Sequence, residues 1–397
     1  MIYILVLIAI FYGVLTYDIR QKNDTKSSYY HFIMIVLILI SGLGYRMGGD
    51  GMAYMFEYPQ YNVKEGFSWA ALNSYPGRQP AWVLLCKICR SFTEEYWLFK
   101  LVHAILVNCM VFYGLKRLTS YRFTAILFYF VLIYFEINFQ VLRQAMAVGL
   151  FLVAIQYMRD NKWIKYYLLV ALAIAFHETA LVCIAFPLIK FIRIDKSGLM
   201  LIAGISLIAI LFSSNILDSI INIDLPEEYA DKWSYYTNDI DTSSTFSSYL
   251  NVLLSFVIPT VYIFFRKTNH GDVLVEKGAL MYGLLYILGL YFPIIYRINL
   301  YFIFFFYLAY IDLIYDLSKY GLSLFESNVR KIKSITLSGT KALTYVTLII
   351  VFLGIKSRFY FSEYGDTGMP AWVQYYPYTS VIFKDIDKTR EEFIHRL

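Results

Sequence analysis

Charged residues are scarce in this chain of 397 residues. Lysine, arginine, aspartate and glutamate make up 16% of it, whereas 59% is hydrophobic. Soluble globular domains carry about 25% charged residues, so the shortage argues against a soluble protein. Apolar runs bounded by basic clusters recur along the whole chain, each close to the roughly 17 to 25 residues that a membrane-spanning helix needs. We interpret the chain as a polytopic membrane protein.

Several signatures of common enzyme classes are also missing. The chain has four cysteines; Cys86 and Cys89 have CxxC spacing, but no second pair follows, which argues against a zinc or redox centre. The five histidines do not have the spacing of metal ligands. Neither a Walker motif nor GxGxxG is present, which argues against a nucleotide-driven pump or a dinucleotide enzyme. We therefore predict no cofactor, no metal and no nucleic-acid partner.

The apolar runs predict an all-α fold, because a helix satisfies its own backbone polar groups inside a membrane. We expect one transmembrane helical domain over residues 1–356, with long outer loops at 45–94 and 214–248, and a C-terminal tail at 357–397 on the outer face. The loop at 214–248 is rich in carboxylates and is either a solvated cap or a lid. Twelve candidate spans lie near residues 2–17, 29–44, 95–115, 121–137, 138–158, 163–176, 178–191, 198–213, 249–265, 278–293, 297–317 and 342–356.

The distribution of basic residues predicts the topology. The first apolar run has no basic stretch before it and no small-residue cleavage site after it, so we expect a retained span rather than a signal peptide. Most of the 35 lysines and arginines fall into six clusters between the runs, and such clusters favour the cytoplasmic side. All six face the cytoplasm only if both termini lie outside. One long helix over 163–193 would move every later loop to the other side of the membrane, and the basic clusters would face outward. We therefore predict two short helices that turn at 176–179, either as two spans or as a re-entrant pair.

With this topology, polar residues of unusual placement collect at the outer face. The stretch "GYRMGGDGMAY" places Arg46, Asp50 and Tyr54 four residues apart, so all three can share one face of a helix and form a hydrogen-bonded group. The alternative is a loop that its glycines keep flexible, with an interfacial arginine whose charge reaches the headgroups. The full set of candidate residues is Arg46, Asp50, Tyr54, Arg143, Gln144, His177, Glu178 and Arg297.

Arg143 is the strongest of these candidates. It lies with Gln144 inside the apolar run "NFQVLRQAMAVGLFLVAIQYM", where a charge costs about 2.5 to 3.5 kcal/mol and usually marks a functional site or a buried partner. The alternative is a structural ion pair with a carboxylate such as Glu136. Arg297 is either a second functional arginine or an interfacial anchor beside Tyr296.

His177 and Glu178 lie between two apolar helices. A lone histidine there is commonly a packing residue, but the adjacent glutamate and the shared membrane face with three arginines favour a functional role. Guanidinium groups suit phosphate and pyrophosphate, which they bind through two parallel hydrogen bonds. Arginines could stabilise a pyrophosphate leaving group, and a carboxylate or histidine could deprotonate an attacking sugar hydroxyl.

At these residues the chain resembles a known family, the EpsG-like, Wzy-type polysaccharide polymerases of bacterial envelopes. The resemblance is carried, over about residues 40–385, by "RMGGDGMAY", "LRQAMAVGL", "LAIAFHETALV" and "YYPYTSVIF". Family roles carry over to five positions, which are Arg46, Asp50, Tyr54, Arg143 and His177.

The resemblance implies a fold and an activity. The fold would be a GT-C-like membrane glycosyltransferase in the bacterial cytoplasmic membrane with its active face outside. The reaction would transfer a growing glycan from undecaprenyl pyrophosphate to another lipid-linked repeat unit, building capsular polysaccharide, exopolysaccharide or O-antigen without a nucleotide sugar. Partners would be the lipid-linked oligosaccharide, the bilayer, and a chain-length regulator and a flippase. In this hypothesis Arg143 and Arg297 hold the donor pyrophosphate, and Arg46 orients the site through Asp50.

The chain departs from the family pattern at one position. Family members tend to have an acidic residue before a proline in the first long outer loop, where this chain has Gln79 before Pro80. A carboxylate at that position therefore cannot be the base. The predicted base is His177 or Glu178, with Asp50 as the rival.

Two other functions are compatible with some of these residues. A flippase or transporter for lipid-linked sugars would also need internal arginines, but transporters commonly show internal repeats, and none is visible here. A membrane O-acyltransferase that modifies polysaccharide could use His177, but it would leave the arginines without a role. A purely structural scaffold would leave all the outer polar residues unexplained.

Overall fold

The computed structural model describes residues 1–206, 208, 245–268, 271–290, 294–325 and 337–396. This part of the chain consists of helices, turns and two isolated β-bridges, so the predicted all-α class is confirmed. Most of the loop predicted at 214–248 lies outside the described residues. The chain divides into two compact units, one formed by Met1–Ile184 and Ser334–Leu397 and the other by Ala185–Lys333.

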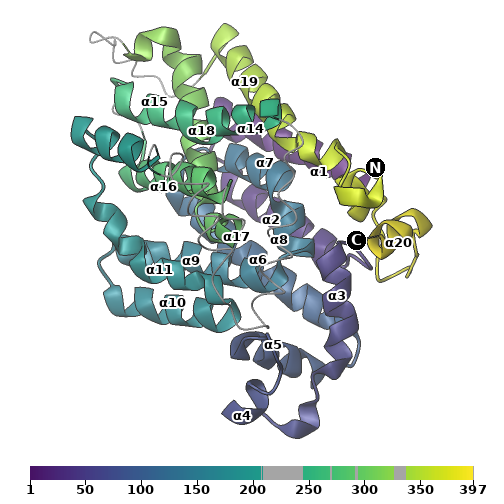
Figure 1. The fold of residues 1–397 in the computed structure, drawn as a ribbon. Coiled ribbons are helices and arrows are strands. Elements are labelled where there is room, and N and C mark those ends of the chain that lie inside the picture. The colour runs from purple at the N-terminus through teal and green to yellow at the C-terminus, as the bar shows by residue number, and fades with distance from the viewer. Residues whose placement is uncertain (207, 209–244, 269–270, 291–293, 326–336, 397) are drawn as a thin grey trace. The chain divides into compact units, whose positions relative to one another are not determined.

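The first unit is a bundle of helices that is followed by a C-terminal segment. Within it α6 packs against both α2 and α9, and α9 packs against α10 (Figure 1). Its helices are α1 (Ile2–Gly13), which continues as a π-helix over Val14–Ile19, α2 (Lys26–Gly42), α3 (Gly49–Glu57), α4 (Trp69–Leu72), α5 (Pro80–Arg90), α6 (Tyr96–Leu118), α7 (Arg122–Leu132), α8 (Tyr134–Phe139), α9 (Leu142–Arg159), α10 (Trp163–Phe176), α19 (Thr340–Ser357) and α20 (Lys388–His395).

The chain passes from the first unit to the second within α11 (Val182–Ala185). In the second unit α16 packs against both α17 and α18. Its described helices are a 3-10 segment over Phe186–Phe191, a helix over Lys196–Ser206, α14 (Thr245–Val252), a π-helix over Leu253–Val257, α15 (Ile258–Phe265), α16 (Val273–Gly289), α17 (Ile294–Asn299) and α18 (Ile303–Tyr320).

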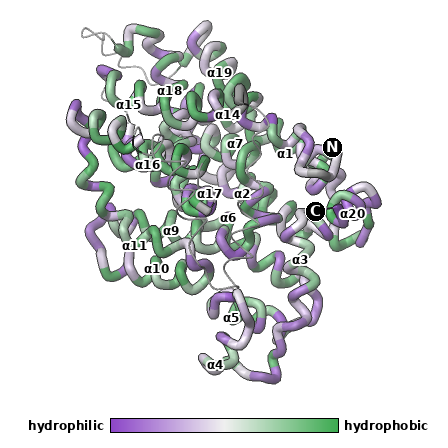
Figure 2. The backbone as a smooth tube through the Cα atoms, viewed as in Figure 1, coloured by the Kyte–Doolittle hydropathy of each residue, from purple (hydrophilic) through white to green (hydrophobic). Residues whose placement is uncertain are grey.

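In the part of the chain that the structure describes, three helices are long and apolar enough to cross a membrane, namely those over Ile2–Ile19, Tyr96–Leu118 and Thr340–Phe361. Shorter apolar helices accompany them, and Figure 2 shows hydrophobic residues along α9 and α10, with hydrophilic residues in α20 and between α3 and α5. This composition is consistent with a helical membrane protein. The count of twelve spans remains a prediction.

The turn predicted at 176–179 is confirmed. α10 ends at Phe176, and His177 takes an extended conformation with φ −155° and ψ 126°. The chain then returns along α10. A hydrogen bond of 2.5 Å from the Tyr166 hydroxyl to the backbone oxygen of Cys183 shows that the two segments lie side by side. One long helix over 163–193 is therefore excluded.

Two predicted span boundaries are wrong. The run at 121–137 is divided, because α7 ends at Leu132 and α8 begins at Tyr134. The run at 297–317 is divided as well, and Arg297 lies in the short helix α17 rather than at the start of α18. Both errors arise because an apolar run stays apolar across a break of one to three residues, so hydropathy does not show the break.

Candidate functional site

The glycines of the "GYRMGGDGMAY" stretch allow α3 to approach α8 closely. Gly48 has φ +76°, and a Cβ atom built on it would lie 2.3 Å from the Phe139 backbone oxygen. A Cβ atom on Gly51 would lie 2.4 Å from the same oxygen. The Asp50 backbone N–H also donates to the Gln140 side-chain oxygen at 2.9 Å. These glycines therefore serve close packing, and the alternative of a flexible loop is wrong.

We expect Gly51→Ala to push α3 away from the end of α8, because the added carbon would overlap a backbone oxygen that has no freedom to rotate away. Overpacking of this kind costs about 1 to 3 kcal/mol, so the thermal midpoint of the detergent-purified protein should fall. Gly354→Ala in α19 is the matched control, since a Cβ atom there meets nothing within 4 Å. Equal midpoints for the two variants would show that the close approach is not required.

Arg46 lies before α3 and not on it. Its backbone has φ +50°, and α3 begins at Gly49. The predicted helical face shared by Arg46, Asp50 and Tyr54 is therefore wrong, since only the last two belong to the helix. The Arg46 guanidinium instead forms two hydrogen bonds with Glu391 of α20, from Nε to Oε1 at 2.7 Å and from Nη2 to Oε2 at 2.5 Å.

The C-terminal tail is attached to the same loop by further bonds. Arg390 is 1% exposed, and its guanidinium donates to the Arg46 backbone oxygen at 3.1 Å, to the Thr379 hydroxyl at 2.6 Å and to the Pro377 backbone oxygen. The tail thus fixes the conformation of the loop that leads into α3. The backbone hydrogen bonds between the two segments are Tyr45 N–H to Thr379 O at 3.0 Å, Gly48 N–H to Gln374 O at 3.0 Å and Val381 N–H to Leu43 O at 2.9 Å.

This attachment should depend on pH. The hydrogen bond from Arg46 lowers the pKa of Glu391, and burial, which raises it, is the smaller effect. A carboxyl with a lowered pKa stabilises the fold above its unfolded pKa of about 4.3 and loses that contribution as the pH falls through its folded pKa. We expect wild type to exceed Glu391→Gln in thermal midpoint at pH 7, and the difference to shrink below about pH 4.

A neighbouring glutamate provides the control for this measurement. Among the described residues Glu392 forms an ion pair with exposed Arg396, which caps the same helix, and with no other side chain. Such surface pairs contribute little. Glu392→Gln should therefore follow wild type at every pH. A difference between wild type and Glu391→Gln that is the same at pH 3 and pH 7 would contradict the role of the ion pair.

Arg143 is held by oxygen atoms from three positions. Its Nε donates to the Tyr54 hydroxyl at 3.2 Å, and its Nη1 donates to the Gly77 backbone oxygen and to the Gln79 side-chain oxygen, both at 2.9 Å. Among the described residues Arg143 forms no ion pair, so the predicted alternative of pairing with Glu136 is wrong. The structure thus brings together Tyr54 and Arg143, two of the residues predicted from the sequence.

Gln79 links this arginine to Glu178. Its amide nitrogen donates toward the Glu178 carboxylate at 3.5 Å, at the limit of hydrogen-bond distance, while its amide oxygen accepts from Arg143. Gln79 is the position where the chain departs from the family pattern. An amide cannot act as a base, and the nearest carboxylate that it contacts is the exposed side chain of Glu178.

His177 has a local structural role. It is 4% exposed, and its Nδ1 accepts the Thr179 backbone N–H at 3.3 Å, which caps the 3-10 helix over Glu178–Leu181. The same Nδ1 lies 2.7 Å from the Thr179 hydroxyl, and the tautomer of the ring decides which of these two atoms is the donor. These two contacts with Thr179 hold the turn that follows α10.

A second arginine and a carboxylate lie beside Arg143, and sequence reasoning missed both. Arg78 forms an ion pair with Glu57 through two hydrogen bonds, and the Tyr61 hydroxyl also donates to Glu57. Burial raises the pKa of Glu57, but the bonds from Arg78 and Tyr61 and the charges of Arg78 and Arg143 outweigh it and hold this pKa below its usual value. A pocket of about 310 Å³ adjoins the pair and is lined by Ala53, Phe56, Glu57, Gln60, Tyr75, Pro76 and Arg78.

The remaining predicted residues lie elsewhere. Asp50 is exposed, and Gln144 is buried in α9 next to Arg143. Arg297 belongs to the second unit. That Arg297 and Arg143 hold the same pyrophosphate stays a prediction. Across the described ranges, no group of three or more His, Cys, Asp and Glu side chains is arranged to hold a metal ion.

The comparisons with known proteins extend over most of these residues. The sequence model of the EpsG family matches residues 27–380, a range that includes the α3 loop, Arg143, His177 and most of the tail. Comparisons with curated proteins and with solved structures gave no match. The match covers well over half of the chain and confirms the resemblance seen in the motifs. The chain therefore belongs to the EpsG family, which is associated with exopolysaccharide biosynthesis.

Proposed function

We propose that this protein is a membrane glycosyltransferase that polymerises lipid-linked oligosaccharide repeat units. It would transfer a growing glycan from undecaprenyl pyrophosphate to the next repeat unit at the outer face of the cytoplasmic membrane, with about twelve spans, both termini outside and a GT-C-like arrangement. Family membership and the apolar helices support this proposal. Chain-length regulation and flipping would be the work of partner proteins.

The observation that carries the proposal is the set of contacts that Arg143 makes. It is a half-buried arginine at the start of α9, it has no carboxylate partner in the described part of the chain, and three oxygen atoms hold its Nε and Nη1. Its Nη2 donates no hydrogen bond to any described residue. A charge fixed in this way suits an anionic ligand, and a pyrophosphate oxygen is an acceptor of the right kind.

The reaction follows from these groups. The acceptor sugar hydroxyl attacks the anomeric carbon of the donor glycan, a new glycosidic bond forms, and the bond to the pyrophosphate oxygen breaks. The electron pair leaves on the pyrophosphate, where Arg143 would stabilise the developing charge. The hydroxyl proton passes to a base, for which Glu178 is the best placed candidate because Gln79 joins it to Arg143.

We propose different parts for the other residues. Arg46 and Glu391 would act as positioning residues that fix the loop before α3, rather than through Asp50 as the sequence suggested. Tyr54 orients Arg143. The pocket beside Glu57 and Arg78 offers aromatic and hydrogen-bonding side chains of the kind that accommodate a sugar, and we assign it to the acceptor.

The deciding experiment compares glycans in cells that lack the protein with glycans in cells complemented by wild type. We expect single lipid-linked repeat units to persist on the outer leaflet, and the ladder of longer glycans to return only on complementation. Repeat units trapped on the cytoplasmic leaflet would indicate a flippase instead. A full-length polymer that lacks only an acyl group would indicate an O-acyltransferase.

A further inference from the structure

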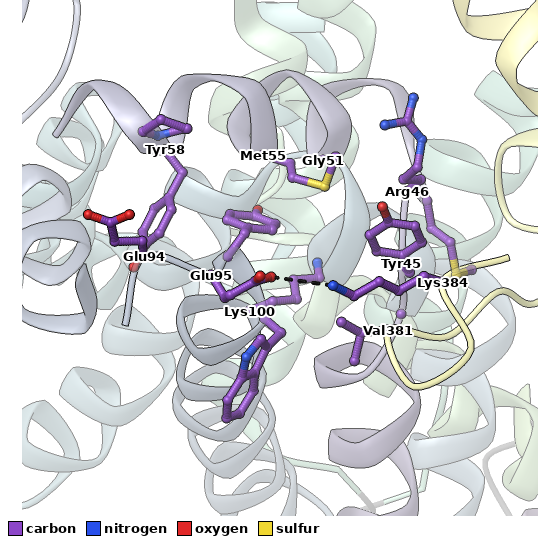
Figure 3. Close-up of a pocket in the computed structure, with 15 residues that line it drawn as sticks. Tyr45, Arg46, Gly51, Met55, Tyr58, Glu94, Glu95, Lys100, Val381 and Lys384 are labelled. Carbon is purple, nitrogen blue, oxygen red and sulfur yellow. Dashed lines mark ion pairs between the residues drawn. The ribbon is translucent and has the colours of Figure 1, made fainter. Parts of the chain in front are cut away.

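The C-terminal tail connects the ends of four helices in the first unit. It follows directly from α19, and Figure 3 shows Lys384 of the tail pointing toward Glu95, the residue before α6. The basic clusters predict that the starts of α1 and α6 and the ends of α2 and α19 all lie on the outer side of the membrane, so the tail runs along one membrane surface. Its contacts are the Tyr3 hydroxyl with the Tyr375 backbone oxygen at 2.8 Å, the Tyr378 hydroxyl with the Ile40 backbone oxygen at 3.2 Å, and the Lys384 ammonium with the Glu95 carboxylate at 3.8 Å.

Two of these helices leave much apolar surface uncovered by the rest of the fold. Phe32, Ile35 and Leu39 of α2 are 46% to 51% exposed. In the helix over Thr340–Phe361, only 22% of the most apolar stretch of 18 residues is buried. Soluble proteins rarely expose apolar patches of this kind, whereas the acyl chains of a bilayer cover them on a spanning helix. The tail is therefore attached to helices whose outer surfaces suit contact with lipid.

The tail exposes three large apolar side chains close to the end of α2. Ile382, Phe383 and Ile386 are 60% to 74% exposed. The segment that carries them is held in place, because the Val381 N–H donates at 2.9 Å to the backbone oxygen of Leu43, the first residue after α2. The end of a spanning helix marks the level where headgroups meet acyl chains, and apolar and aromatic side chains are common at that level.

We infer that Ile382, Phe383 and Ile386 insert into the boundary between headgroups and acyl chains and anchor the tail to the membrane surface. Lipid is the occupant because the segment adjoins the lipid-facing surface of α2. Residues 382–388 contain two lysines and two aspartates, whose charges cancel, so insertion rests on apolar area rather than on attraction to anionic headgroups. Since the tail also holds the loop before α3, the anchor would fix the depth of that loop. The inference goes beyond the proposed transfer reaction and does not depend on it.

The test is spin-label accessibility in the full-length protein, reconstituted into phosphatidylcholine vesicles. Labels at Phe383→Cys and Ile386→Cys should collide more often with oxygen, which concentrates among acyl chains, than with a water-soluble nickel chelate. The expected depth is about 5 to 10 Å into the boundary between headgroups and acyl chains. A label at Glu392→Cys, an exposed position of α20, is the control and should collide mainly with the chelate. Wild type carried through the same labelling gives the background of the four native cysteines.

Two matched charge substitutions test the apolar basis of the anchor. Phe383→Glu adds a charge among the apolar side chains and should make the label at Ile386→Cys as accessible to the chelate as the control label. Thr389→Glu adds the same charge at an exposed position of α20 and should leave that label unchanged, as should added phosphatidylglycerol. Labels at 383 and 386 that are open to the chelate in the unsubstituted tail, or shielded from both reagents by a second copy of the chain, would overturn the inference. A depth that appears only with anionic lipid would overturn it as well.

Discussion

Replacing Arg143 with lysine should abolish the glycan ladder while the protein remains in the membrane. We expect glycans longer than one repeat unit to fall by at least about a hundredfold, the usual cost of losing a donor that stabilises a developing negative charge. Lysine keeps the positive charge but offers three donors on one nitrogen, whereas arginine spreads five donors over a rigid fork. A lysine therefore cannot replace both the bonds to Tyr54, Gly77 and Gln79 and the bonds to pyrophosphate.

The measurement is gel analysis of lipid-linked and surface glycan in cells complemented with each variant, with the protein quantified in the membrane fraction. Arg159→Lys is the matched control. Arg159 lies at the other end of the same helix, α9, away from Arg143 and the residues that hold it. It should support a normal ladder. A normal chain length in Arg143→Lys at equal membrane level would refute the pyrophosphate role of Arg143.

Local patterns in the sequence predicted the helices well. Hydropathy found the apolar helices, and the basic clusters required a turn near His177, where α10 ends at Phe176. The same patterns could not show the division between α7 and α8, because the residues around Ile133 are all apolar. They also placed Arg46 on a helix that begins only at Gly49, since regular spacing says nothing about where helical geometry starts.

The partners of the candidate residues were much harder to predict. Arg46 pairs with Glu391, 345 positions away, and Arg143 is held by Gly77 and Gln79 from a loop without periodicity. No spacing rule connects such residues, since only the packed bundle brings them together. The apolar setting of Arg143 indicated a functional charge, and an ordinary arginine in a polar segment, such as Arg78, gave no comparable signal.

Substitutions at the turn after α10 should separate the two candidate bases, Glu178 and His177, by their effect on the rate of polymerisation. Glu178→Gln should lower the rate of polymerisation by about 10² to 10⁴, the usual contribution of a general base. The amide keeps the size of the side chain and its hydrogen bond with Gln79 but cannot accept the proton. His177→Asn should retain a nearly normal ladder, because asparagine is among the preferred residues at a helix N-cap and can accept the Thr179 N–H as His177 does.

Initial rates of ladder formation in membrane vesicles supplied with lipid-linked repeat units would measure both variants at matched protein levels. Asp50→Asn tests the third candidate in the same assay and should be close to wild type when Glu178 is the base, because asparagine keeps the size of the side chain and the backbone bond to Gln140. A lost ladder in His177→Asn together with an intact ladder in Glu178→Gln would move the base to His177. That result would place the proton acceptor on the buried ring of His177, at the turn where α10 ends.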